Sequence, residues 1–326
     1  MSQQSQTEKL AVSQAGSVAM ASSGSLPSVG DFFELLKPRV MSLVIFTGFV
    51  GMYLASGSLH PALSAISLLA IAAGAGASGA INQWYDRDVD AVMSRTQNRP
   101  IPSGRVEPSE ALALGVIISV LSVLVLSLAS NFLAGGLLAF TIFFYAVVYS
   151  VWLKRSTPQN IVIGGAAGAL PPVVGWAAVT GEISVDALIL FALIFIWTPP
   201  HFWALALVKN EDYRKAGIPM LPVIVGREKT ISQMYLYSAV LAVLGMMPSI
   251  TGLLSPVYGG FAALMGGIFF VRMHRLKRSG SDDDALSLFT FSILYLFALF
   301  AGMLVDKMAS DFGYLAMAQN LMTSSL

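Results

Sequence analysis

The sequence predicts an all-α integral membrane protein, a bundle of about nine transmembrane helices. Hydrophobic residues make up 56% of its 326 residues, and the mean hydropathy of +0.72 is too high for a soluble globular domain. Apolar stretches of about 20 residues, the length that crosses a bilayer as a helix, recur along the chain. Cysteine is absent, which excludes disulfides and thiolate metal sites.

The elements follow one another without a long linker. Residues 1–30 are rich in Ser, Gln, Gly and Ala and have no basic region followed by an apolar core, so we expect a disordered cytoplasmic tail and no signal peptide. Helices are the expected form of the spans, because in lipid a helix satisfies its own backbone groups. One transmembrane domain is therefore predicted over residues 31–306, followed by a short tail, 307–326. The nine spans are expected at 40–57, 62–82, 109–129, 132–152, 160–180, 185–207, 231–253, 256–273 and 286–305.

The basic residues predict the orientation of the bundle. Of the 19 lysines and arginines, 18 fall in the N-terminal tail and in alternate loops, and only Lys307 falls on the other side. Basic loops stay in the cytoplasm. The N-terminus is therefore predicted inside and the C-terminus outside, which agrees with an odd number of spans, and a central cavity is expected to open to the cytoplasmic side.

A cluster of charge ends the second span, in "NQWYDRDVDAVMSRTQNRP", residues 82–100. Asn82, Asp86 and Asp90 are spaced i, i+4 and i+8, which places them along one helical face. Such oxygen donors suit Mg²⁺, which takes few protein carboxylates and completes its shell with phosphate oxygens. A solvated, self-paired loop is the alternative; it explains the arginines better than the three aligned oxygen side chains. The arginines that follow can meet phosphate charge directly: Arg95, Arg99 and Arg105.

Two more loops on the same predicted face carry charge. "YSVWLKRSTPQN" places Lys154 and Arg155 at the end of the fourth span. "WTPPHFWALALVKNEDYRKAGIPMLPV" closes the sixth span with a run of charged residues between 209 and 215. Three such loops can converge over a cavity between the helices. That arrangement fits a polar head at the membrane surface and an apolar tail inside the bundle, the shape of an isoprenoid diphosphate.

The same stretches resemble a known family. "NQWYDRDVDAVMSRTQNRPIPSGR" looks like the first aspartate-rich motif of the UbiA superfamily of intramembrane prenyltransferases. Its Met-x-Arg-Thr-x-x-Arg-Pro extension is similar to the protohaem IX farnesyltransferase branch, as are "WTPPHFWALAL", "DYRKAGIPMLPV" and "LKRSTPQNIVIGG". The resemblance runs from about residue 32 to 305.

The resemblance implies a reaction, a metal and a site. Farnesyl diphosphate would give its farnesyl group to a vinyl group of haem B, and water would capture the new cation to leave a hydroxyethylfarnesyl side chain, as in haem O. Mg²⁺ would be held by Asn82, Asp86 and Asp90, with Lys154 and Asp212 as further catalytic residues. In the wider superfamily the second motif is Asp-x-x-x-Asp, whereas here those positions are Lys209 and Tyr213, which leaves open whether one or two Mg²⁺ ions bind. From the resemblance together with charge and position, the candidate substrate-binding residues are Arg95, Arg99, Arg105, Arg155, Lys209, Tyr213, Arg214, His201 and Tyr149.

Two of these residues have an alternative interpretation from position alone. His201, near the inner end of the sixth span, can ligate haem iron or orient the porphyrin, or it can be a hydrogen-bonded interfacial histidine. Tyr149 can stabilise a carbocation through its ring face. It can equally belong to the aromatic belt at the membrane interface.

The expected setting is the inner membrane of a bacterium, with many spans and an active site that faces the cytoplasm. The expected partners are the lipid bilayer, the two substrates and terminal-oxidase assembly factors, and no nucleic acid. A sister enzyme that prenylates an aromatic acid or a quinone precursor is the alternative within the class. A secondary transporter is the alternative outside it, but no ionisable residue lies deep inside the spans, and nine spans do not divide into equal halves.

Overall fold

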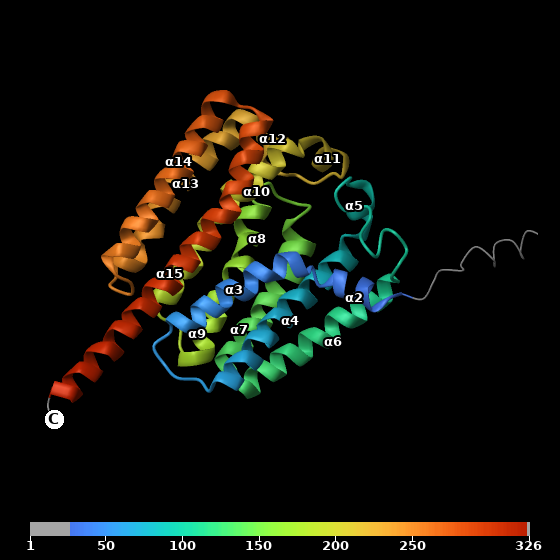
Figure 1. Ribbon diagram of the computed structural model, residues 1–326. Coiled ribbons are helices and arrows are strands. Elements are labelled where there is room, and N and C mark those ends of the chain that lie inside the picture. The colour runs from blue at the N-terminus through green and yellow to red at the C-terminus, as the bar shows by residue number, and fades with distance from the viewer. Residues whose placement is uncertain (1–26, 325–326) are drawn as a thin grey trace, which may run out of the picture.

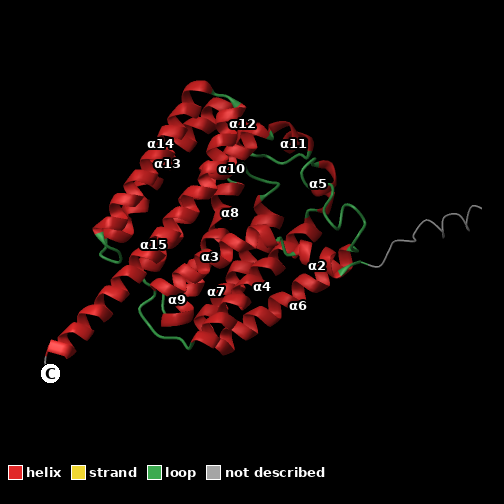
Figure 2. Cartoon of the chain, viewed as in Figure 1, coloured by secondary structure: helices red, strands yellow, loops and turns green. Residues whose placement is uncertain are grey.

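The computed structural model describes residues 27–324, with side chains described through residue 313, and over this range it is built from helices without a strand (Figures 1 and 2). Most of the predicted N-terminal tail lies outside the described residues. In chain order the elements are α2 (Val29–Leu35), α3 (Pro38–Leu54), α4 (Pro61–Tyr85), α5 (Arg87–Val92), α6 (Pro108–Ala129), α7 (Phe132–Phe143), the π-helix η1 (Phe144–Leu153), α8 (Asn160–Ala169), α9 (Pro171–Thr180), α10 (Val185–Val208), α11 (Asn210–Lys215), α12 (Leu221–Val225), α13 (Arg227–Ile250), α14 (Pro256–Ser279) and α15 (Asp282–Ser324).

The predicted membrane bundle is confirmed in its main features. Within the described range, eight helices are long and apolar enough to cross a membrane, and a ninth is added if α2 and α3, bent by 55°, count as one span. The last helix, α15, continues well past the predicted end at residue 305.

Prolines and polar caps begin the helices at the places where the apolar stretches start. A proline in the first turn costs no hydrogen bond, because the first N–H groups of a helix have no intrahelical partner. Ser184 accepts from the backbone N–H of Ala187 and so caps α10. The helices with proline in the first turn include α3, α4, α6, α9 and α14.

The predicted fifth span is divided. Helix α8 ends at Ala169, and α9 begins at Pro171, with Leu170 between them. Pro172 follows directly, and proline in a helix interior removes a backbone hydrogen bond and clashes with the preceding turn. The Pro171–Pro172 pair therefore interrupts the helix between α8 and α9.

Helices α3 and α9 approach each other at glycines. A Cβ atom on Gly51 would lie 2.2 Å from the carbonyl oxygen of Pro172, and one on Gly175 would lie 2.2 Å from that of Gly48. Small residues allow this backbone contact, the usual means by which membrane helices associate.

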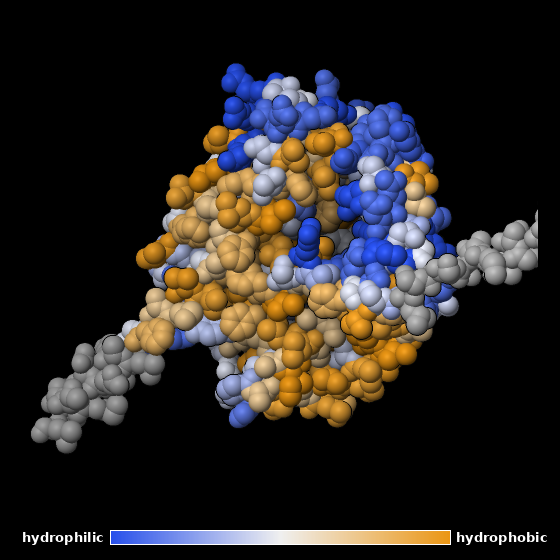
Figure 3. All heavy atoms as spheres, turned by 45° about the vertical axis from the view of Figure 1, so that its right-hand side comes forward, coloured by the Kyte–Doolittle hydropathy of each residue, from blue (hydrophilic) through white to orange (hydrophobic). Residues whose placement is uncertain are grey.

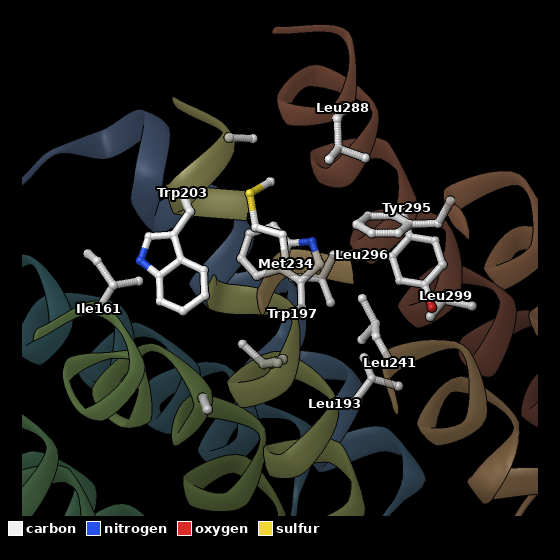
Figure 4. Packing of buried hydrophobic residues seen from close by; sticks show 14 of the residues in the cluster. Ile161, Leu193, Trp197, Trp203, Met234, Leu241, Leu288, Tyr295, Leu296 and Leu299 are labelled. Atoms are coloured by element: carbon white, nitrogen blue, oxygen red, sulfur yellow. The ribbon is translucent and has the colours of Figure 1, made fainter. Parts of the chain in front are cut away.

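The largest core lies among α10, α13, α14 and α15, where Trp197, Trp203 and Tyr295 are buried with leucines from the same helices (Figure 4). The outer surface is apolar instead of polar: Leu128, Phe132 and Val257 are each about four-fifths exposed. Figure 3 shows this hydrophobic surface beside a band of hydrophilic residues, with a recess where the two meet. An apolar exterior of this kind is the surface that a membrane-embedded protein presents to lipid.

A separate small core holds the loop that follows α5. Ile101 and Val106 from this loop are buried against Leu35 of α2, Ala80 of α4 and Ala111 of α6. The loop carries Arg95, Arg99 and Arg105, so this packing fixes the backbone beside the charged motif.

Candidate active site

The oxygen side chains of the first motif are buried where α4 passes into α5. The exposed fractions of Asn82, Asp86 and Asp90 are 4%, 0% and 2%. The chain turns at Asp86, which ends α4, yet the backbone N–H of Asp86 donates to the Asn82 carbonyl at 2.9 Å and that of Asp90 to the Asp86 carbonyl at 2.8 Å. The predicted i, i+4, i+8 register is therefore kept across the join.

Asp86 is surrounded by donors from distant parts of the chain. Its carboxylate accepts from the Asn82 amide at 2.6 Å and from the Lys154 ammonium, and Arg155 lies at 3.4 Å. A fully buried carboxylate is stable only when such groups compensate its charge. Lys154 and Arg155, predicted from the loop after the fourth span, thus reach the first motif.

Asp90 is held from within its own loop. Arg99 donates to the Asp90 carboxylate at 2.6 Å, and the Thr96 hydroxyl donates to the Asp90 carbonyl at 3.0 Å. The loop therefore folds back over α5, and the Arg99 side chain is part of the same cluster as the carboxylates.

Lys37 is a member of this cluster that the sequence analysis missed. Its ammonium donates to Asn82 Oδ1 at 2.8 Å, and the charges of Arg99, Lys154, Asp90 and Asp86 all act on it. Its backbone is left-handed, with φ 53° and ψ 57°. A non-glycine residue in that region is uncommon, and an L-residue there is strained unless its surroundings hold it in place. In the sequence Lys37 stands directly before the proline that begins a span, but nothing there links it to Asn82.

The π-helix η1 aims further groups at the cluster. Its i to i−5 bonding is seen where the Lys154 N–H donates to the Tyr149 carbonyl at 2.8 Å. π-Helical turns are rare and are frequently found at functional sites. The Ser150 hydroxyl, also missed from the sequence, accepts from the Asn82 amide at 3.0 Å. Tyr149 stacks on Tyr145, and its ring passes so close to Gly164 that a Cβ there would lie 2.2 Å from it.

The second charged loop contacts the first. Helices α5 and α11 lie at the same end of the bundle (Figure 1), and the Ser94 hydroxyl donates to the Asp212 carboxylate at 2.5 Å. Tyr213 is buried beside it, whereas Arg214 is exposed and pairs with Glu211 at 2.6 Å. Arg95 is exposed and Lys209 half-buried at the end of α10. The predicted convergence of the loops is present, but Arg214 is engaged on the surface.

Arg155 and Arg105 make their main contacts outside the buried carboxylates. Arg155 donates two hydrogen bonds of 2.7 Å to the Asp88 carboxylate. This contact raises the pKa of Arg155 and lowers the pKa of Asp88 to about 2. Arg105 pairs with Asp31 and Glu34 of α2. Arg105 therefore fastens α2 to the loop, and in this structure it is not joined to Asp86 or Asp90.

His201 lies apart from the carboxylates, between α10 and α15. Its Nδ1 is 2.6 Å from the Ser292 hydroxyl, and its ring stacks on Trp197 and Phe289 with centroid distances of 4.2 and 4.7 Å. The side chain is 7% exposed. It is a buried, hydrogen-bonded histidine, and whether it also meets haem stays a prediction.

The donor set fits a hard divalent cation. Among the described residues no three His, Asp or Glu side chains are grouped closely enough to hold a metal ion by themselves. A metal here depends on the Asn82 amide and on ligand oxygens in addition to the two carboxylates, the mixed shell that Mg²⁺ prefers. The surrounding cations, Lys37, Lys154, Arg99 and Arg155, suit an anion bound against that metal.

Comparison with known proteins assigns the chain to a family. The model of the UbiA prenyltransferase family matches residues 44–300. The chain belongs to the UbiA prenyltransferase family. It is 55% identical over 300 residues to a protein named protoheme IX farnesyltransferase from Rhizobium leguminosarum bv. trifolii, covering 90% of this chain and 95% of the relative. It is 58% identical over 301 residues to the protein of that name from Beijerinckia indica, covering 91% and 92%.

Solved structures of UbiA proteins share the fold. A digeranylgeranylglyceryl phosphate synthase superposes with a TM-score of 0.72 at 18% identity, covering 86% of this chain and 98% of its own. A UbiA homolog from Archaeoglobus fulgidus bound to GPP and Mg²⁺ superposes with a TM-score of 0.62 at 20% identity, covering 84% and 99%. The UbiA fold is therefore the fold of this chain.

Proposed function

We propose that this protein transfers the farnesyl group of farnesyl diphosphate to a vinyl group of haem B, with addition of water, to give haem O and diphosphate. The observation that carries the proposal is the 55–58% identity to proteins named protoheme IX farnesyltransferase over about nine-tenths of both chains. The buried cluster at the ends of the spans supports it, since it offers oxygen donors and cations together.

The reaction requires the site to stabilise negative charge on the diphosphate leaving group. When the allylic carbon–oxygen bond breaks, diphosphate gains negative charge and the farnesyl carbon gains positive charge. Asn82, Asp86 and Asp90 would hold Mg²⁺, which when bound supplies charge neutralisation at the diphosphate. Lys154 and Arg99 already lie within hydrogen-bonding distance of the two carboxylates, so they are placed to meet the same anion.

The organic half of the reaction needs no protein nucleophile. The farnesyl carbon bonds to the terminal vinyl carbon, the adjacent carbon becomes the cation, and a water oxygen bonds to it with loss of a proton. Tyr149, stacked on Tyr145 beside the cluster, is proposed to face the allylic cation. The proposed roles of the remaining residues are contacts to diphosphate or to haem propionates: Arg95, Arg105, Arg155, Lys209, Asp212, Tyr213 and Arg214, with His201 toward the porphyrin.

We place the site on the cytoplasmic side of a bacterial inner membrane, with the N-terminus inside. The support is the distribution of the lysines and arginines, of which 18 of 19 fall in the tail and loops on one predicted side of the membrane. The proposed organisation is a tail of residues 1–30, a transmembrane prenyltransferase domain of residues 31–306 and a C-terminal segment of residues 307–326. Terminal-oxidase assembly factors remain the proposed protein partners.

The test is a turnover assay in lipid. Purified protein is incubated with haem B, farnesyl diphosphate and Mg²⁺, and the porphyrin is followed by mass spectrometry. A product with the mass of haem plus farnesyl plus hydroxyl, absent after chelation, is expected. Unchanged haem from folded protein would reject haem as the acceptor, and the same assay with aromatic acids and quinone precursors would then test the alternative within the family.

A further inference from the structure

A groove runs between α14 and α15, which pack side by side in the bundle (Figure 1). Its volume is about 670 Å³, and it is lined by one face of α14 between residues 263 and 275 together with Asp284 and Ser287 of α15. The buried cluster around Asp86 and Asp90 contributes no residue to this lining. The groove is therefore separate from the candidate active site.

The wall of the groove on α14 is apolar and faces outward. Leu264, Ile268 and Val271 line it at helical spacing, and their side chains are 63%, 38% and 68% exposed. Over residues 263–275 the helix rises about 18 Å, and one leaflet of the hydrocarbon core is about 15 Å thick. The groove thus has the length and the apolar surface that one acyl chain of a phospholipid requires.

Two adjacent glycines in this stretch of α14 differ in what surrounds them. A Cβ atom on Gly266 would lie 3.1 Å from the Cβ atom of Ala242 on α13, so Gly266 allows two helices to approach. A Cβ atom on Gly267 would meet no atom within 4 Å. Gly267 therefore leaves the groove open and is not needed for contact with a neighbouring helix.

Arg272 lies at the end of the groove that is predicted to face the cytoplasm, and its guanidinium is held in place. Its central carbon lies 4.5 Å from the centre of the Phe291 ring, and Nη1 donates to the Ser287 hydroxyl at 2.7 Å. A guanidinium offers five N–H donors. Within the part of the chain that the structure describes, Arg272 forms no ion pair, whereas Arg275 pairs with Asp284 at 3.4 Å. Arg272 is thus a fixed cation with donors to spare.

The aspartates near the groove do not cancel this charge. Asp284 accepts from the hydroxyls of two neighbouring serines in addition to its contact with Arg275. Asp282 pairs with Arg227 of α13 at 2.8 Å. Asp283 is exposed and lines an adjoining groove that shares Arg272. Residues 272–284 hold four lysines and arginines against these three aspartates, and Arg227 adds a fifth basic group, so positive charge is in excess.

We propose that this groove binds one anionic phospholipid, with the phosphate against Arg272 and Arg275 and one acyl chain along the apolar wall of α14. Arginine meets phosphate through paired N–H donors. Basic pockets between transmembrane helices on the cytoplasmic side bind anionic headgroups. Apolar surface alone does not make such a site: residues 106–153 also expose leucines and phenylalanines, but this stretch has no lysine or arginine. The lipid site is independent of the proposed function, because it shares no residue with the carboxylate cluster.

The experiment is native mass spectrometry of the full-length protein in detergent, titrated with phosphatidylglycerol or with phosphatidylcholine of the same acyl chains. The wild type should bind one phosphatidylglycerol at least about tenfold more tightly than phosphatidylcholine, and Arg272→Gln should lose this preference, because charge-assisted hydrogen bonds contribute about that factor. Arg278→Gln is the matched control, since Arg278 is exposed in the last turn of the same helix and lies outside the groove. It should keep the preference.

A second pair of variants tests the groove without changing a charge. Gly267→Leu should fill the groove and abolish the tight phosphatidylglycerol adduct, and the open space around Gly267 leaves the fold unaffected. Gly260→Leu is its control, because Gly260 lies earlier in the same helix, has equally open space and does not line the groove. It should retain the adduct.

Each outcome supports or overturns the proposal. Equal binding of the two lipids by the wild type, or equal losses in Arg272→Gln and Arg278→Gln, would overturn the headgroup site. Equal retention in Gly267→Leu and Gly260→Leu would overturn the site for the chain. Displacement of phosphatidylglycerol by millimolar inorganic phosphate would indicate a site for a free anion instead. A wild-type dimer that Gly267→Leu alone dissociates would indicate that a second copy of the chain occupies the groove.

Discussion

Two acidic clusters lie in the loops predicted to face the cytoplasm, and their environments are opposite. In the cluster at the end of α4, the carboxylates of Asp86 and Asp90 are 0% and 3% exposed. In the cluster that begins α15, Asp282 is 63% exposed and Asp284 is 20% exposed. Both stretches are rich in aspartate and have basic residues nearby, so acid content alone does not distinguish them.

The burial of the contacts does distinguish them. Asp86 is fully buried and is met by Lys154 from 68 positions away and, through Asn82, by Lys37. Asp284 accepts from Ser279 and Ser281, its close neighbours in sequence, at the first turn of a helix whose dipole favours acids. Asp282 also has a distant partner, Arg227 of α13 at 2.8 Å, but this pair lies at the surface. We infer that burial and convergence, not the count of carboxylates, mark the site.

The largest expected effect comes from removing a buried carboxylate. Asp86→Ala should lower turnover at least about 1,000-fold, because it removes a proposed metal ligand and leaves Lys154 without its counter-charge. Asp282→Ala, in the exposed cluster, should change turnover less than about twofold. The readout is farnesylated porphyrin per mole of folded protein, with folding checked by size-exclusion chromatography. Activity retained in Asp86→Ala would contradict the assignment of the site.

A smaller effect is expected at Lys37. Because Lys37 has a positive φ, Lys37→Gly removes the ammonium without straining the backbone. Turnover should fall about 100-fold, the typical cost of removing one preorganised donor from a developing anion. The exposed Lys229, changed to Gly or Ala, serves as the control for loss of a positive charge on the same predicted face. If Lys37→Gly matched that control, Lys37 would belong to the structure of the α2–α3 bend and not to the site.

Lys37 also shows where sequence reasoning stops. The spans and the register of the first motif follow from local periodicity and local backbone chemistry, so they could be predicted. Contacts between segments could not: nothing local tells that Lys37 meets Asn82, or that Ser94 meets Asp212.

Two further contacts could not be predicted, for definite physical reasons. A π-helix has the same apolar composition as an α-helix, so the placement of Ser150 beside Asn82 is not visible in the pattern. The carboxylate partners of Arg105 come from α2, a short helix before the first predicted span. The role of Arg105 in substrate binding stays a prediction, as does the chemistry that the motif indicates.

The smallest effect is expected at Asp88, which allows an exposed and a buried aspartate to be compared within the first motif. Asp88 lies between Asp86 and Asp90 in sequence, but its side chain is 62% exposed. Its ion pair with Arg155 is therefore screened by water, and Asp88→Asn should cost well under about 1 kcal/mol in the free energy of unfolding and change turnover little.

The stability difference between wild type and Asp88→Asn should depend on pH in a definite direction. The pKa of Asp88 is lowered from 3.8 to about 2 in the folded protein, so the folded state favours the ionised form. The stabilisation is then fully present above about pH 4 and is lost as the pH falls toward 2. Thermal unfolding of wild type and Asp88→Asn should differ by the same amount at pH 7 and pH 5 and converge below pH 4. Convergence already near pH 6 would mean that Asp88 titrates as a buried acid, and burial would then fail to separate Asp88 from its neighbours Asp86 and Asp90.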